Sequence, residues 1–250
     1  MLRPEFFHSG AVAVSLSGIC WDSFHKLAWW DWISSLAQLV WRSSEQQKAG
    51  LSIEYRLADL NVFELERDSF DVVFASGALH HIHELERLLL QVRDCLSTNG
   101  FLIASEYVGP NQLQWTDSQV RAINDILELL PSRYKRRISA STEFKLSFLG
   151  PSSIEEMNRA DPTEAVHSED TVPLVRNIFR MVEFKPIGGT ILHMMLQDII
   201  GNFQPGNDAD DCILRLICQL EWNLISSGQL GSDFAYFVAR PVTDREAPLK

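Results

Sequence analysis

Short apolar runs and amphipathic segments alternate along the chain. Residues 51–60 alternate apolar and polar positions, which predicts a strand that ends in a turn. Residues 70–76 (FDVVFAS) form a nearly continuous apolar run, as expected of a strand buried on both faces of a parallel sheet. Residues 84–97 place leucines on one helical face, and 101–107 (FLIASEY) predict another buried strand. This β-α-β order predicts a right-handed crossover in a parallel sheet.

The pattern becomes polar and irregular after the third of these strands. A capping box of Thr116 with Gln119 predicts a helix that Pro131 ends. The residues that follow are polar and interrupted by prolines. We interpret 111–178 as an insertion that lies as a lid over the carboxyl edge of the sheet, within a single domain of residues 1–250.

Regular elements return near the end of the chain. Strands are predicted at 181–189 and 233–241, with helices at 191–203 and 209–227 between them. Such a pair of late strands predicts an antiparallel closing strand on an otherwise parallel sheet. The predicted fold class is therefore α/β, with a mostly parallel sheet, helices on both faces and a helical insertion after the fifth strand.

Composition excludes some classes of partner. The 250 residues contain 22 basic and 33 acidic side chains, a formal net charge of −11. Phosphate backbones and anionic membrane surfaces repel such a chain, so we expect neither a nucleic acid nor a membrane as partner. No apolar run approaches the roughly 20 residues of a membrane span. The first ten residues contain an acid and a histidine where a signal peptide has its apolar stretch, so we expect a cytoplasmic protein of unknown oligomeric state.

Polar residues follow the apolar strands at the ends where open α/β sheets bind ligands. Asp59 suits the hydroxyl or amino groups of a nucleoside, or the capping of a turn. Ser76 and Gly77 are small enough for a ligand to approach the backbone. Glu106 and Tyr107 end the next strand, where a carboxylate and a phenol can orient a substrate. The alternative for Glu106 is a salt bridge with an arginine of the insertion.

Three histidines, His80, His81 and His83, follow the strand at 70–76. Adjacent histidines cannot both point at one ion from a regular helix, and no carboxylate lies at a spacing typical of zinc enzymes. The four cysteines match neither a zinc pattern nor a disulfide framework. We therefore expect no metal. We assign function to His81 alone, because an imidazole has the intrinsic pKa of a general base, and we assign the other two histidines to the turn.

Residues 70–110, FDVVFASGALHHIHELERLLLQVRDCLSTNGFLIASEYVGP, resemble class I S-adenosylmethionine-dependent methyltransferases (type 11/12) from their fourth strand through their fifth. The runs DPTEAVHS (161–168) and GGTILH (188–193) resemble a narrower subgroup of small-molecule type. The resemblance implies a Rossmann-like fold and S-adenosylmethionine as cofactor. It places His81 opposite the reacting methyl. The residues that it places along the cofactor, from the adenine to the methionine part, are Asp59, Leu60, Asn61, Ala75 and Ser76.

The N-terminal part departs from that family, whose members carry a glycine-rich loop after the first strand and an acid after the second. Residues 11–18 (AVAVSLSG) predict the first strand, but Gly18 is the only glycine left for cofactor binding there. The second strand, predicted at 29–37, ends without an acid. A diverged pocket, a lost cofactor site and a reading-frame error each explain this departure.

Three function classes follow. The first is methyl transfer by in-line displacement to an unidentified small-molecule acceptor, with His81 as base or orienting group and Glu106 and Tyr107 positioning the acceptor. Glu164 and His167 would then supply polar contacts from the lid. The second is a non-catalytic methyltransferase-like protein that binds a ligand or partner in the same crevice. A metal-dependent hydrolase that uses the three histidines has the least support.

Overall fold

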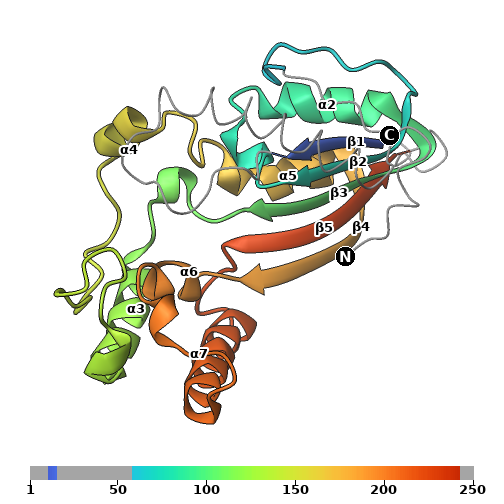
Figure 1. The fold of residues 1–250 in the computed structure, drawn as a ribbon. Coiled ribbons are helices and arrows are strands. Elements are labelled where there is room, and N and C mark those ends of the chain that lie inside the picture. The colour runs from blue at the N-terminus through green and yellow to red at the C-terminus, as the bar shows by residue number, and fades with distance from the viewer. Residues whose placement is uncertain (1–10, 16–57, 243–250) are drawn as a thin grey trace, which may run out of the picture.

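The computed structural model describes residues 11–15 and 58–242, and these contain a five-stranded sheet (Figure 1). Predictions for Gly18, for the strand at 29–37 and for most of the strand at 51–60 lie outside the described residues. The strands are β1 (Ala11–Ser15), β2 (Phe70–Ser76), β3 (Leu96–Tyr107), β4 (Phe179–Gly188) and β5 (Phe234–Pro241).

Four of the five strands run in one direction, and β5 runs against them. β1 pairs in parallel with β2, and β2 with β3, whereas β5 lies antiparallel between β3 and β4. The α/β fold class, with a mostly parallel sheet and an antiparallel closing strand, is confirmed. β3 begins earlier than predicted, because Leu96 pairs with Phe70 before the register shifts. The preceding helix therefore ends at Cys95.

Two helices, α2 (Leu85–Cys95) and α5 (Ser168–Ile178), pack on one face of the sheet. The predicted leucine face of α2 is confirmed as the side that packs on the core. α5 contributes to the same core, although its residues fall in the 111–178 segment. Val72 and Phe74 point to the other face and are partly exposed, so β2 is fully buried on one face only. The main residues of this core are Val73, Ala75, Leu85, Leu88, Leu89, Val92, Leu102, Ala104, Val175 and Phe237.

A second apolar core lies beyond the carboxyl ends of β3 and β4 (Figure 1). It is formed by α3 (Asp117–Leu129), α6 (Leu192–Leu196) and α7 (Asp208–Ser226), which we call the helical cap. One helix of the cap precedes β4 in the chain and two follow it, so segments far apart in sequence pack together. The buried side chains of the cap include Ile123, Leu127, Tyr134, Met195, Ile199, Phe203 and Ile217.

The single helix predicted at 191–203 is wrong. α6 ends at Leu196, and a 3₁₀ turn, η5 (Ile200–Asn202), follows. Asp198 between them has a φ of 65°, which α-helical geometry excludes. The amide and the hydroxyl of Ser139 each donate a hydrogen bond to the Asp198 carboxylate at 2.7 Å, and these bonds hold the break.

The predicted capping box of Thr116 and Gln119 is confirmed and also fastens the cap to the sheet. The Thr116 hydroxyl accepts from the Gln119 amide at 3.3 Å, and the Gln119 side-chain oxygen accepts from the Thr116 amide at 2.8 Å. Gln119 Nε2 donates to both carboxylate oxygens of Asp233, directly before β5, at 3.0 Å. Burial raises the pKa of Asp233 to about 6, because the ionised form loses its hydration there.

A buried carboxylate also fixes the end of β4. Glu221 on α7 accepts hydrogen bonds from the amides of Gly189 (3.1 Å), Ile191 (2.7 Å) and Leu192 (2.9 Å). Gly188 has a φ of 92°, and a Cβ at this position would collide with the Glu221 carboxylate. Glycine is therefore required where the backbone approaches this side chain.

The short helix α4 (Ile154–Ala160) contributes no buried residue to either core.

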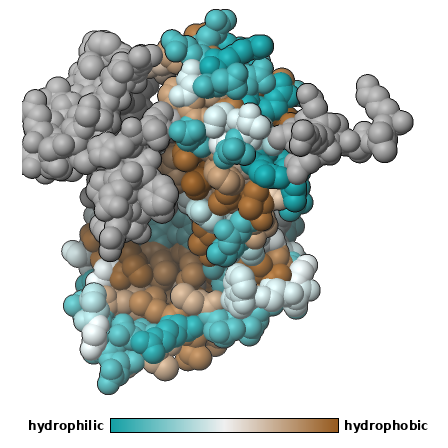
Figure 2. Space-filling view, turned by 90° about the vertical axis from the view of Figure 1, so that its right-hand side faces the viewer, coloured by the Kyte–Doolittle hydropathy of each residue, from teal (hydrophilic) through white to brown (hydrophobic). Residues whose placement is uncertain are grey.

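Large exposed apolar side chains occur on β4 and α7, and Figure 2 shows apolar residues in the middle of the face and toward its lower part. On β4, Val182 and Phe184 are two residues apart and share a face, as the pleat requires, whereas Ile187 lies beside a register shift between Pro186 and Gly188. Within residues 58–242, no helix has the length and apolar character that crossing a bilayer requires. The exposed side chains are Val182, Phe184, Ile187, Leu216, Leu220 and Trp222.

Replacement of Glu221 by leucine is expected to lower the free energy of unfolding by about 3 kcal/mol or more, because one buried and two partly buried amides lose their acceptor. Urea unfolding followed by circular dichroism measures the change. Glu128→Leu, at an exposed position of α3, is the matched control and should change the free energy by less than about 0.5 kcal/mol. Equal effects of the two substitutions would contradict the assigned role of Glu221.

Candidate functional site

The carboxyl ends of β2 and β3 lie side by side, and the chain turns there directly above β3. Ser76 is paired with Ser105 in the sheet, and the Gly77 amide donates to the Ser105 carbonyl at 3.0 Å. Gly77 has a φ of 55°, a conformation that glycine adopts at little cost. The turn leads into η2 (Leu79–His81), a short 3₁₀ helix that places both histidines at the carboxyl edge.

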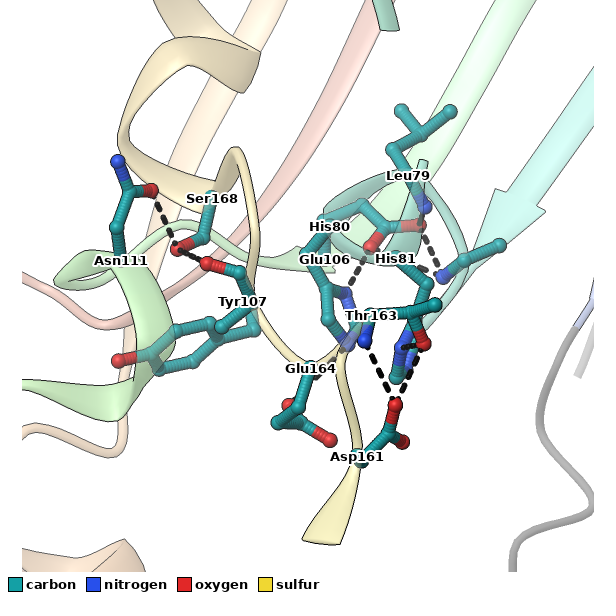
Figure 3. A network of polar contacts seen from close by, with 12 residues as sticks. Leu79, His80, His81, Glu106, Tyr107, Asn111, Asp161, Thr163, Glu164 and Ser168 are labelled. Carbon is teal, nitrogen blue, oxygen red and sulfur yellow. Dashed lines mark hydrogen bonds and ion pairs between the residues drawn. The ribbon is translucent and has the colours of Figure 1, made fainter. Parts of the chain in front are cut away.

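Glu106, the next-to-last residue of β3, holds this turn in place (Figure 3). Its carboxylate is 1% exposed and accepts from the amides of Ala78 (2.9 and 3.1 Å) and Leu79 (3.2 Å). It also bonds to Nδ1 of His80 at 2.9 Å. Among residues 58–242, the ion-pair partner of Glu106 is His80, and the alternative salt bridge with an arginine of the insertion is not found. Its predicted contact with a substrate stays a prediction.

The bond to Glu106 fixes the tautomer of His80. A carboxylate accepts hydrogen bonds, so Nδ1 of His80 carries a proton, and in the neutral ring Nε2 then keeps its lone pair. Nε2 faces Glu164 Oε1 at 3.9 Å, which is too long for a hydrogen bond. The carbonyl of His80 accepts from the Val166 amide at 2.9 Å, so the segment around Glu164 is anchored to the turn. His80 thus participates in the cluster directly, beyond the turn role expected from sequence.

His81 has the same tautomer for a different reason. The Thr163 hydroxyl donates to Asp161 at 2.7 Å, and its oxygen lies 3.1 Å from Nδ1 of His81. Because that hydroxyl proton is used, the oxygen accepts from Nδ1–H, and Nε2 keeps its lone pair. Burial, with a smaller effect of His80, lowers the pKa of His81 to about 4. His81 is therefore neutral near pH 7.

Tyr107 is buried beside these histidines. Its hydroxyl donates to the Pro110 carbonyl at 3.1 Å, and its ring packs edge-on against Phe234, with centroids 5.3 Å apart. Burial raises the pKa of Tyr107 above its ordinary value. In this structure the phenol supports the loop after β3, and its predicted contact with an acceptor stays a prediction.

The residues expected along the cofactor lie in two places. Asp59 Oδ1 accepts from the amide (2.9 Å) and the side chain (3.0 Å) of Asn61, and these bonds lower the pKa of Asp59. The turn interpretation of Asp59 is thus correct, while its exposed second oxygen is not used in this turn. Leu60 packs against the sheet core, and Ala75 is buried within it and paired in the sheet with both neighbouring strands, so Ala75 offers no exposed group to a ligand in this structure. Ser76 is partly exposed at the strand end.

Sequence reasoning missed the group that orients His81. Asp161 and Thr163 lie about eighty residues beyond it, and the sequence contains only a local signal, an acid two residues before a threonine. Of the two residues expected on the lid, Glu164 faces the two histidines, and burial raises its pKa. His167 does not face them, because it is half-exposed and pairs with Asp170 at 3.1 Å. Two open hollows elsewhere, on α7 and near Arg93, contain none of these residues.

The comparisons with known proteins match this part of the chain. The family model described as "Methyltransferase domain" matches residues 18–104, which include η2 and both histidines. The segment that carries Asp161, Thr163 and Glu164 lies outside the match. No curated protein is similar enough in sequence to count as a relative. The family model confirms the resemblance to methyltransferases over residues 18–104.

Similar solved structures are found only at low sequence identity and with low TM-scores. An S-adenosylmethionine-dependent methyltransferase from Mesorhizobium loti is 18% identical over 75% of this chain and 69% of its own, with a TM-score of 0.39. The PH0226 protein from Pyrococcus horikoshii OT3 is 12% identical over 94% and 82%, with a TM-score of 0.40. The [4+2]-cyclase SpnF is 13% identical over 80% and 61%, with a TM-score of 0.39.

Burial of a neutral His81 predicts a pH-dependent stability. Its pKa is about 4 in the folded protein and about 6.5 when unfolded, so the unfolded chain binds more protons between these values. The contribution of His81 to stability is therefore complete above pH 6.5 and is lost as the pH falls toward 4. His81→Asn should reduce the slope of unfolding free energy against pH by about 1 kcal/mol per pH unit near pH 5.

Urea unfolding between pH 4.5 and 7.5 measures this slope. His83→Asn, at an exposed position two residues further on, is the matched control and should retain the wild-type slope. A wild-type slope in His81→Asn would show that His81 titrates as it does in the unfolded chain.

Proposed function

Since residues 18–104 match a methyltransferase domain, we propose that the protein binds S-adenosylmethionine at the carboxyl edge of its sheet and methylates a small-molecule acceptor. The observation that supports this best is the position of His81. It lies five residues beyond the end of β2, with Nδ1 held by the Thr163–Asp161 pair and with the lone pair of Nε2 free. A base with a fixed orientation at this edge is what acid–base-assisted methyl transfer requires.

In the proposed reaction an oxygen or nitrogen lone pair of the acceptor attacks the methyl carbon in line with the carbon–sulfur bond. That bond breaks, S-adenosylhomocysteine leaves, and the proton of the acceptor passes to Nε2 of His81. The low pKa of His81 keeps this lone pair available throughout the neutral range. Transfer removes the sulfonium charge while the imidazole gains one, so the positive charge is moved within the site and no additional charge has to be buried.

The remaining residues have supporting roles in this proposal. Ser76 at the end of β2 would contact the methionine part, and the free oxygen of Asp59 would face the nucleoside. Glu164 would contact the acceptor, and the 111–178 segment would exclude water. Glu106 acts on the reaction through the turn that it holds, as a positioning residue.

We also propose a cytoplasmic location and no nucleic-acid partner. Cys212 and Cys218 are free thiols on an exposed face of α7, and Cys95 is a free buried thiol, as is usual in a reducing compartment. The net charge of −11 opposes binding to phosphate backbones.

A second candidate function is a non-catalytic methyltransferase-like protein that has lost cofactor binding and binds another ligand or partner in the same crevice. The bonding of Asp59 to Asn61 favours it, because one oxygen of the acid expected beside the nucleoside is already used. Cofactor binding separates this candidate from the first.

Calorimetric titration of the full-length protein with S-adenosylhomocysteine is expected to show one site per chain. Ser76→Trp should weaken binding at least about tenfold, since the indole would occupy the partly exposed strand end where the methionine part is expected. Thr98→Trp, at an exposed position near the other end of β3, is the control and should bind as wild type. An absence of binding by the wild-type protein would exclude the methyltransferase proposal.

Loss of the base should lower the rate of transfer without lowering cofactor affinity. With a labelled methyl donor and a panel of small hydroxyl and amine compounds, His81→Asn should reduce kcat by about 10²-fold or more on any compound that is methylated. Thr163→Val should reduce it by about tenfold, since the ring stays but loses its orientation. His83→Asn should have no effect. Wild-type turnover in His81→Asn would contradict the role of His81.

A further inference from the structure

We propose that His80, His81 and Glu164 form a binding site for a divalent transition-metal ion, with Zn²⁺ the best match. One ligand atom from each of these side chains lies within 4.8 Å of the other two. Within residues 58–242 no other three histidine, cysteine or acidic side chains meet this condition. The site shares His81 and Glu164 with the proposed methyl-transfer reaction, but it is argued from the geometry of these side chains alone, and its test needs no cofactor.

The positions of the two rings answer the objection that the sequence raised. Adjacent histidines are expected to diverge from a regular helix, yet the rings of His80 and His81 lie with centroids 4.2 Å apart and an interplanar angle of 39°. The missing carboxylate comes from Glu164, which the bond from the Val166 amide to the His80 carbonyl holds nearby. Figure 3 shows both imidazoles and this carboxyl group converging from the two segments.

The distances between the ligand atoms of the three side chains suit the coordination of one metal ion better than they suit direct hydrogen bonds between the side chains. His80 Nε2 and Glu164 Oε1 are 3.9 Å apart, beyond hydrogen-bonding range. Zinc–ligand bonds of about 2.0–2.2 Å in a tetrahedron place ligand atoms roughly 3.3 Å apart. Side-chain movements of about an ångström close this difference. Glu164 can make them, because its side chain is 27% exposed.

The outer contacts of both histidines are those of metal ligands. A ligating histidine usually donates its other N–H to a carboxylate or another acceptor, which fixes the ring and leaves one nitrogen for the metal. Nδ1 of His80 bonds to Glu106, and Nδ1 of His81 bonds to Thr163, which in turn bonds to Asp161. Both Nε2 atoms are left for the ion. These hydrogen bonds to the two Nδ1 atoms are a separate observation from the spacing of the three ligand atoms, and they support the same conclusion.

The donor set selects the class of ion. Two imidazole nitrogens and one carboxylate oxygen suit Zn²⁺ and neighbouring first-row ions, whereas Mg²⁺ and Ca²⁺ prefer oxygen ligands. Three protein ligands leave a fourth position for a water or a substrate oxygen. A bound ion uses the lone pair of His81, and the ion, in place of the imidazole, would then lower the pKa of an acceptor hydroxyl at that position.

The test is a titration of chelator-treated, full-length protein with Zn²⁺ by calorimetry, and with Co²⁺ by its visible absorption. We expect one ion per chain and a cobalt spectrum typical of tetrahedral coordination. His81→Asn and Glu164→Gln should each weaken Zn²⁺ binding by about 10²-fold or more. Thr163→Val, which removes only an outer contact, should weaken it by about 10- to 100-fold. Far-UV circular dichroism shows that each variant is folded.

His167→Asn, in the same segment but paired with Asp170, is the matched control and should bind as wild type. The proposal is overturned if the wild-type protein binds no Zn²⁺ or if the triad variants bind it as tightly as wild type. An equal loss in His167→Asn would also overturn it. Titration of the metal-free protein with S-adenosylhomocysteine is scored separately, so that failure of one proposal leaves the other intact.

Discussion

The buried carboxylate of Glu106 is the interaction on which the candidate site depends. A carboxylate at this depth is stable only if hydrogen bonds replace its lost hydration. The amides of Ala78 and Leu79 and the imidazole of His80 supply these bonds. The requirement fixes the turn after β2 and the orientation of His80. His81 follows directly, so the end of β3 determines where both histidines lie.

Segments from elsewhere in the chain then assemble on this turn. Val166 binds the His80 carbonyl, and Thr163 with Asp161 orients His81. The same physical solution recurs at the end of β4, where the buried Glu221 carboxylate accepts three amides and joins α7 to the sheet edge. In both places a strand end is shaped by an acid on a neighbouring element, because free amides at a buried turn need an acceptor. The cap and the histidine turn are thus parts of one carboxyl-edge assembly.

Local patterns in the sequence predict most of the sheet and its helices. The apolar run of β2, the leucine face of α2 and the capping box of α3 are local signals, and each is confirmed. The break at Asp198 is not predictable in this way, because the hydrogen bonds that hold the Asp198 carboxylate are donated by Ser139, which lies on a distant segment. The joining of α3 with α6 and α7 in one core is likewise a property of tertiary packing.

The site shows the same division between local and distant information. His81 can be singled out from its position after a strand, but its partner Thr163 lies 82 residues away. The expectation of no metal rested on the divergence of adjacent histidines and on the lack of a suitably spaced carboxylate, whereas the two rings lie 4.2 Å apart and Glu164 approaches them from a distant segment. Short-range rules therefore identify the strand end, and the chemistry of the site depends on a loop that those rules cannot place.

The protonation of the two imidazole rings tests this account most directly. Long-range ¹⁵N–¹H correlation spectra of metal-free protein near pH 7 distinguish a proton on Nδ1 from one on Nε2. The account predicts that His80 and His81 are both protonated on Nδ1, held by Glu106 and Thr163, with Nε2 unprotonated. Protonation on Nε2, or rapid exchange between the two tautomers, would show that these contacts do not orient the rings and would contradict the account.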